Sequence, residues 1–99
     1  MIITLLLALL YNPVFAGDAV LGEATFNQNC KQGHGPAGMG LASYPKVSGN
    51  DIDYTIDRLK TYRDGIEVGP NSALMIMMAR PLSDIDIHNL AEYLKEAKR

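Results

Sequence analysis

The chain has 99 residues, a formal net charge of −2 and a single cysteine. So small a charge does not favour nucleic acid or an anionic membrane surface as a partner, and so short a chain forms one domain at most. A single cysteine also excludes an internal disulfide, although small exported domains usually depend on disulfides for their stability.

Residues 1–16 have the features of a signal peptide. An apolar run from Ile2 to Leu10, too short to span a bilayer, is followed by the helix-breaking Asn12-Pro13 and then by Val14-Phe15-Ala16. Small or branched residues at the −3 and −1 positions are typical of a signal peptidase site, so cleavage is expected after this triplet. The alternative is a buried strand or helix, since no basic side chain precedes the apolar run. We therefore predict an exported domain spanning residues 17–99.

The first predicted helix of this domain runs from Asp18 to about Asn29. Asp18 is a suitable N-cap, because its short carboxylate can accept hydrogen bonds from the first free backbone N–H groups. Gly22, Phe26 and the neighbouring alanine and valine positions form a narrow apolar stripe, which is the side of the helix expected in the core.

The second predicted helix runs from about Asp51 to Arg63. Its apolar residues share one face, at the spacing i, i+4 and i+7: Ile52, Ile56 and Leu59. Asn50 or Asp51 can cap its start, and Asp64-Gly65 can end it, with Gly65 supplying a left-handed residue.

The third predicted helix has the clearest start. Ser83 as N-cap and Asp86 three residues later form a capping-box pair, and Leu82 and Ile87 can close a hydrophobic staple around it. The stripe expected in the core consists of Ile87, Leu90, Tyr93 and Leu94.

Two long loops separate the three helices, over residues 33–49 and 67–81, and no segment alternates as a strand would. Long loops in a small domain are usually functional or wrapped around something. The sequence therefore predicts an all-α domain of about three helices with long loops.

A thiol motif lies directly after the first helix. Cys30-Lys31-Gln32-Gly33-His34 has the spacing of C-x-x-C-H, the attachment signature of c-type haem, with Gly33 in place of the second cysteine. A large apolar cofactor held through Cys30 would account for both the odd thiol and the missing disulfides. His34 is the candidate iron ligand, and the carbonyl of Pro45 is a candidate acceptor for its second ring nitrogen.

A second axial ligand is expected from the methionine cluster before the third helix. A thioether opposite histidine gives six-coordinate iron suited to electron transfer. At most one of Met75, Met77 and Met78 can serve, and the others are core filler. The remaining candidates are not expected to ligate the iron. Met39 follows His34 too closely to reach the opposite haem face, and His88 is expected on the surface. The three tyrosines that could hydrogen-bond the haem edges are expected to be ordinary amphipathic core residues instead: Tyr44, Tyr54 and Tyr62.

In their order and spacing these residues resemble the class I cytochromes c of the small soluble bacterial type. The resemblance covers residues 17–98 and is carried by Gly17-Asp18-Ala19, Gly22, Phe26, Asn29-Cys30, His34-Gly35, Tyr44 to Gly49, Pro81 to Asp84 and Asn89 to Leu94. It implies that Gly22 and Phe26 pack against Leu90 and Tyr93, and that the Pro45 carbonyl orients His34. By its distance from Pro81-Leu82-Ser83, the axial methionine matches Met75, with Met78 as the fallback.

The resemblance implies a periplasmic one-electron carrier built around one haem, and not an enzyme. Its partners would be larger redox proteins met by transient docking, with no nucleic acid and no stable membrane insertion, and the chain would be a monomer. Gly33 departs from the family pattern and leaves three alternatives: one thioether through Cys30, non-covalent haem, or no haem. Other functions also stay open, namely a copper-binding module using the soft ligands Cys30, His34 and the methionines, or a haem-free interaction subunit.

Overall fold

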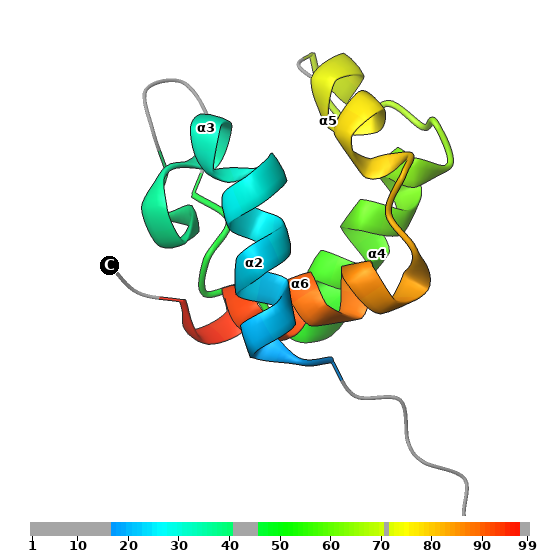
Figure 1. The fold of residues 1–99 in the computed structure, drawn as a ribbon. Helices are drawn as coiled ribbons and strands as arrows, with labels where there is room; N and C mark the ends of the chain where they lie inside the picture. The colour runs from blue at the N-terminus through cyan, green and yellow to red at the C-terminus, as the bar shows by residue number, and fades with distance from the viewer. Residues whose placement is uncertain (1–16, 41–45, 71, 98–99) are drawn as a thin grey trace, which may run out of the picture.

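The computed structural model describes residues 17–40, 46–70 and 72–97, so the predicted signal peptide, Tyr44 and Pro45 lie outside the described residues. The elements are α2 (Ala19–Asn29), α3 (Lys31–His34), the 3-10 turn η1 (Pro36–Gly38), α4 (Ile52–Arg63), α5 (Ser72–Ala79) and α6 (Asp84–Glu96). The described residues contain no strand, which confirms the all-α prediction. In Figure 1, α6 lies across the base, with α2 and α3 on one side and α4 and α5 on the other.

The crossing of α2 and α6 forms the centre of the core. A Cβ atom at Gly22 would collide with the backbone carbonyl of Asn89, so the close approach of the two helices requires glycine there. The Phe26 ring is 1% exposed, and its centroid lies 5.6 Å from that of Tyr93. The predicted contact between the first and last helices is therefore confirmed. The predicted stripe is wrong for the neighbouring positions: Val20 is 76% exposed, and Ala19 and Ala24 are exposed as well. Val20 and Ala24 lie two positions from Gly22, on opposite sides of it in the chain, and so point to the other side of the helix.

The helix starts follow the capping residues of the sequence. Asp18 Oδ1 accepts hydrogen bonds from the N–H groups of Val20 and Leu21, and Ser83 and Asp86 form the predicted capping box at the start of α6. The start of α4 differs, because the Asp51 side chain makes no capping hydrogen bond there. Asp51 is thus the N-cap residue, one of the two that the sequence predicted, but it does not supply the expected hydrogen bond.

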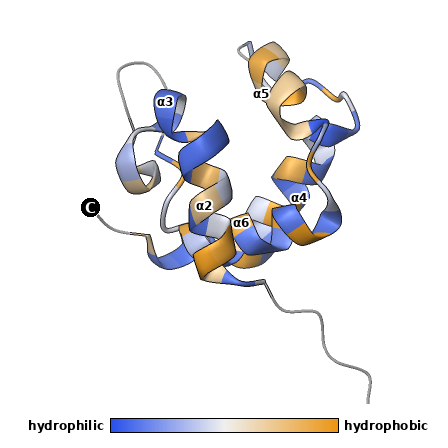
Figure 2. Ribbon diagram, in the orientation of Figure 1, coloured by the Kyte–Doolittle hydropathy of each residue, from blue (hydrophilic) through white to orange (hydrophobic). Residues whose placement is uncertain are grey.

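Helix α5 corrects the prediction of a long loop over residues 67–81. Alanine, leucine and methionine favour helices, but a segment that is apolar all round shows no helical period (Figure 2). Ser72 Oγ accepts hydrogen bonds from the N–H groups of Val68 and Gly69, both at 2.8 Å, and so closes the turn that precedes the helix. The described residues thus contain five α-helices where three were predicted, with α3 and α5 as the additional ones. Within the described ranges, none of the helices combines the length and apolar character needed to cross a bilayer.

Candidate functional site

A cavity of about 920 Å³ lies between the two sides of the molecule, within the size range of sites for small organic groups. Helices α2 and α3 contribute one wall, α4 and α5 contribute the facing wall, and α6 contributes Leu90 and Leu94. The lining is mainly apolar and includes Phe26, Val47, Leu59, Leu74, Ala79 and Leu82.

The predicted thiol and imidazole share one wall of this cavity. The carbonyl oxygen of Cys30 accepts hydrogen bonds from the N–H groups of Gly33 (3.1 Å) and His34 (2.9 Å), so a tight turn brings both side chains to the cavity. His34 is 8% exposed. Burial raises the pKa of the Cys30 thiol to about 11, so the sulfur is protonated at neutral pH. Gly33 lies in the same wall, at the place of the second cysteine of the motif.

The segment after His34 is held against α6. Gly40 N–H donates a hydrogen bond to the His34 carbonyl at 2.7 Å, and the N–H groups of Val47 and Ser48 donate to the Gly38 carbonyl. Gly38 has φ of 68°, and a Cβ atom there would press on Leu94 of α6 at 3.0 Å. This packing fixes the backbone that carries the imidazole.

Two of the three candidate methionines face the cavity. Met75 and Met78 lie three positions apart on α5, hence on one face of the helix, and both are half-buried in the cavity wall. Met77 is 62% exposed and is not part of that wall. The arrangement therefore brings Cys30 and His34 opposite Met75 and Met78, and leaves Met77 outside.

Two of the other candidates, Met39 and His88, lie apart from this arrangement, and Tyr54 and Tyr62 belong to it. Met39 Sδ accepts a hydrogen bond from Ser48 Oγ at 3.3 Å and does not line the cavity, and neither does His88. Both tyrosines line the cavity, but Tyr62 is half-buried, whereas Tyr54 is 51% exposed. The prediction of an ordinary core residue is thus wrong for Tyr54.

Two cations in the cavity wall were missed by sequence reasoning. Lys46 and Arg58 both line the cavity, and its described lining contains no aspartate or glutamate. Arg58 donates a hydrogen bond to the Tyr54 hydroxyl at 3.2 Å and lies 5.2 Å from the centre of that ring. The signal was the spacing of Tyr54, Arg58 and Tyr62, each four residues from the next and so on one side of α4.

The donor set and the lining fit a haem. Haem is a large apolar ring with two carboxylates, and the cavity offers an apolar lining together with cations and no described carboxylate. A thiol and an imidazole on one wall, with thioethers on the other, match the covalent and axial bonds that a c-type haem makes.

Comparison with known proteins supports this fit. Residues 19–98 match the Cytochrome c family. Cytochrome c-554(548) of Halomonas halodenitrificans is 46% identical over 79 residues, which cover 79% of this chain and 94% of that protein. Cytochrome c-554(547) of Halothiobacillus neapolitanus is 32% identical over 95 residues, covering 84% of this chain and 100% of that protein. A thiosulfate dehydrogenase electron acceptor of Stutzerimonas stutzeri is 38% identical over 65 residues, covering 65% of this chain and 30% of that protein.

Solved structures of cytochrome c4 share the fold. The protein from Acidithiobacillus ferrooxidans aligns with a TM-score of 0.72 and 26% identity, over 85% of this chain and 52% of that one. Reduced recombinant cytochrome c4 from Pseudomonas stutzeri gives a TM-score of 0.72 and 28% identity, over 85% and 53%. The chain thus spans about half the length of these two proteins. It belongs to the cytochrome c family, as an electron-carrying haem protein with c-type haem as its cofactor.

Proposed function

We propose that this chain is a one-electron carrier whose single haem is bonded to Cys30 by one thioether and ligated by His34 and Met75. The observation that supports this most directly is the placement of Cys30 and His34 on one cavity wall and of Met75 on the facing wall. A bound haem supplies one reversible electron step, between ferrous and ferric iron. The chain itself contributes the ligands, the apolar surroundings and the exclusion of water from them.

The two proposed axial ligands rest on different observations. His34 is buried on a backbone turn that fixes its position, and by resemblance to the family the Pro45 carbonyl would accept a hydrogen bond from its second ring nitrogen and so fix the ring. Met75 is preferred to Met78 because its distance from Pro81 matches the family pattern. Met78 is the fallback, since it lines the same wall.

A single thioether is compatible with stable haem binding. Cys30 would hold the haem by adding its S–H bond across one vinyl group, with sulfur on one carbon and hydrogen on the other, a reaction that needs no oxidant or reductant. Gly33 offers no second thiol, and losing a covalent link of this kind costs on the order of 2–4 kcal/mol of stabilisation. Two axial bonds and a large apolar group buried among aliphatic side chains offset that loss.

Two protein ligands on the iron leave no position for a substrate, so we propose a carrier and not an enzyme. The matches to cytochromes c do not favour a copper-binding or haem-free module.

The proposed location is the periplasm, reached by a signal peptide over residues 1–16 that is cleaved after Ala16. Two relatives are named as electron acceptors of thiosulfate dehydrogenase, which supports a larger oxidoreductase as a redox partner of this monomeric chain. Such partners would meet the protein through a small, transient interface.

The deciding experiment is the mass of the purified exported protein under denaturing conditions, with a visible redox spectrum of the native sample. A mass equal to residues 17–99 plus one haem, with a reversible redox-linked spectrum, would support signal-peptide cleavage, the single thioether and the electron-carrier function. The bare mass with the same spectrum would leave a carrier with non-covalent haem. The bare mass with no haem spectrum would contradict the proposal.

A further inference from the structure

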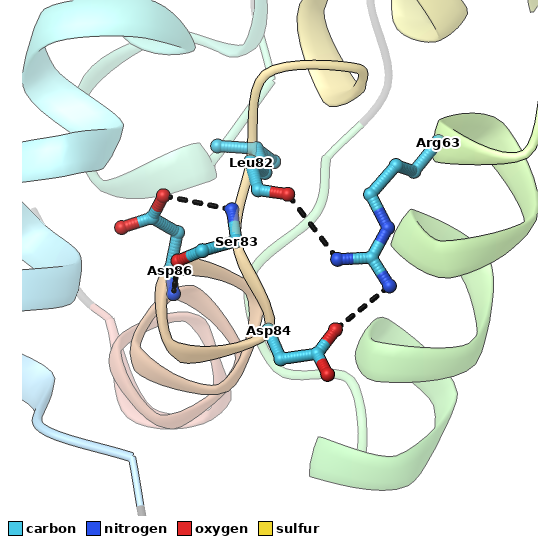
Figure 3. A network of polar contacts seen from close by, with 5 residues as sticks. All are labelled: Arg63, Leu82, Ser83, Asp84 and Asp86. Atoms are coloured by element: carbon cyan, nitrogen blue, oxygen red, sulfur yellow. Dashed lines mark hydrogen bonds and ion pairs between the residues drawn. The ribbon is translucent and has the colours of Figure 1, made fainter.

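Arg63, the last residue of α4, reaches the segment that connects α5 to α6 (Figure 3). Its Nη1 donates a hydrogen bond to the carbonyl oxygen of Leu82 at 3.2 Å, and its Nη2 lies 2.7 Å from Oδ1 of Asp84. The planar guanidinium thus holds two residues of the connection at once, with a geometry that the single ammonium of lysine does not reproduce.

The connecting segment is also fixed at both of its ends. The N–H of Leu82 donates a hydrogen bond to the carbonyl of Ala79, the last residue of α5, at 3.0 Å. At the α6 end, the Ser83 hydroxyl and the Asp86 carboxylate each accept a hydrogen bond from the other residue's N–H, both at 3.0 Å. Arg63 joins this fixed segment to the C-terminal end of α4.

This connection determines where α5 lies. Helix α5 packs on α4, and its buried last residue, Ala79, is hydrogen-bonded to Leu82. Leu82 itself lines the cavity, as do Met75 and Met78 of α5. The carbonyl that Arg63 holds therefore belongs to the wall that presents the methionines.

The facing wall depends on a different contact. Cys30 and His34 follow α2, which is fixed to α6 by the Gly22 crossing. The distance between the two walls thus depends on how the α4–α5 pair sits on α6. Arg63 acts at that junction, because it is the α4 residue that bonds the beginning of α6 at Asp84.

We propose that Arg63 is a positioning residue for the axial methionine: by joining the end of α4 to the α5–α6 connection, it keeps Met75 within bonding distance of the iron. This inference rests on the proposed His34/Met75 ligation. A soft thioether competes poorly with nitrogen ligands for ferric iron. Freedom gained by α5 would therefore appear as easier ligand exchange, before any unfolding.

The test compares haem-loaded ferric proteins titrated with imidazole, which replaces the thioether and changes the visible spectrum. For Arg63→Gln we expect an apparent dissociation constant for imidazole about tenfold lower than in the unmodified protein, because the thioether-released state is more populated. Asp84→Asn keeps the Leu82 contact, so it should give a smaller shift in the same direction. If Arg63→Gln does not retain haem, Asp84→Asn alone tests the proposal.

Asp18→Ala is the matched control. It removes the carboxylate that caps α2, which is not part of the α5–α6 connection or of the cavity lining, so it should lower the stability of the fold and leave the imidazole affinity unchanged. An equal increase in imidazole affinity in Asp18→Ala would overturn the positioning role, because the effect would then follow from stability alone. Unchanged affinity in Arg63→Gln and Asp84→Asn would overturn it as well.

A further variant separates this inference from the proposed function. Met75→Ala should bind imidazole much more tightly than the unmodified protein, because no thioether has to be displaced. If Met75→Ala and the unmodified protein bind imidazole equally, the His34/Met75 ligation fails and the inference fails with it. If only the Arg63 and Asp84 variants behave like the unmodified protein, the ligation stands and the inference alone is overturned.

Discussion

Gly22 and Asn89 meet backbone against backbone where α2 crosses α6, so closely that no side chain fits between them. The side chain of Asn89 belongs to the same contact, because its Oδ1 accepts a hydrogen bond from the N–H of Asp18 at 2.7 Å. Asn89 of α6 thus contacts both Gly22 of α2 and Asp18, the residue that caps α2. The cavity walls depend on this crossing for their separation.

Gly22→Ala should therefore destabilise the protein by about 1–3 kcal/mol, since the added methyl group forces the helices apart. The measurement is urea unfolding of the haem-loaded protein, followed by far-UV circular dichroism. Asn27→Ala, at an exposed position of the same helix, is the control and should change the stability by less than about 0.5 kcal/mol. Equal stabilities for the two variants would contradict the close crossing.

Met75→Ala should abolish the spectrum of His/Met-ligated iron, because the remaining side chain cannot ligate. Met77→Ala is the control, because its side chain points away from the cavity and should leave the spectrum unchanged. The readout is the ferric visible spectrum together with the reduction potential, which falls when the thioether is lost. Loss of the spectrum in Met78→Ala, with Met75→Ala unaffected, would assign the axial ligand to Met78, one helical turn further along α5.

Gly33→Cys should restore the second thiol of the motif, raise the share of chains that carry covalent haem and stabilise the haem-loaded protein. The expected gain in unfolding free energy is on the order of 2–4 kcal/mol, as for a crosslink. The measurements are the mass under denaturing conditions, urea unfolding of the haem-loaded protein and the count of free thiols. Gln32→Cys adds a thiol one residue away in the same cavity wall, and it should leave that thiol free and the stability unchanged. Equal covalent haem content and equal stability in Gly33→Cys and the unmodified protein would mean that the missing thiol has no effect.

Stability in acid should depend on Asp84. The hydrogen bond from Arg63, and then its charge, hold the pKa of the Asp84 carboxyl below its ordinary value. The ionised form is favoured in the folded state, so its contribution is complete above the unfolded-state pKa of about 3.9 and is lost as the pH falls through the lower folded-state pKa. The difference in unfolding free energy between the unmodified protein and Asp84→Asn should be present at pH 7 and disappear in strong acid. A constant difference would show that the charge is not involved.

Most of the fold could be predicted because its signals are local. Asp18 and the Ser83–Asp86 pair mark the starts of α2 and α6 within a few residues of sequence, and the structure confirms both caps. Helix α5 could not be predicted in this way. Its residues are apolar on every side, so periodicity is absent, and its position depends on α4 and on the connection held by Arg63.

In the candidate site, too, the features set by local sequence could be predicted and those set by the packing of the helices could not. The proximity of Cys30 and His34 follows from a spacing of four residues, which one turn of backbone brings to the same wall. The choice between Met75 and Met78 does not follow, because helical spacing presents both to the cavity. Arg58 was missed because an arginine on an amphipathic helix reads as a solvent-facing residue, and only the position of α4 makes it part of the lining.

The pairing of α2 with α6 also has a consequence for the order of assembly. These are the first and last helices of the described chain, so a polypeptide emerging from its N-terminal end cannot complete its core until residues 84–96 have appeared. Cys30 directly follows α2, and its side chain becomes half-buried in the cavity wall once the domain has closed. If haem is attached at Cys30 as proposed, topology would therefore set the time for attachment: the thiol is most accessible while the C-terminal helix is still missing, and closure of the core would then enclose the finished bond.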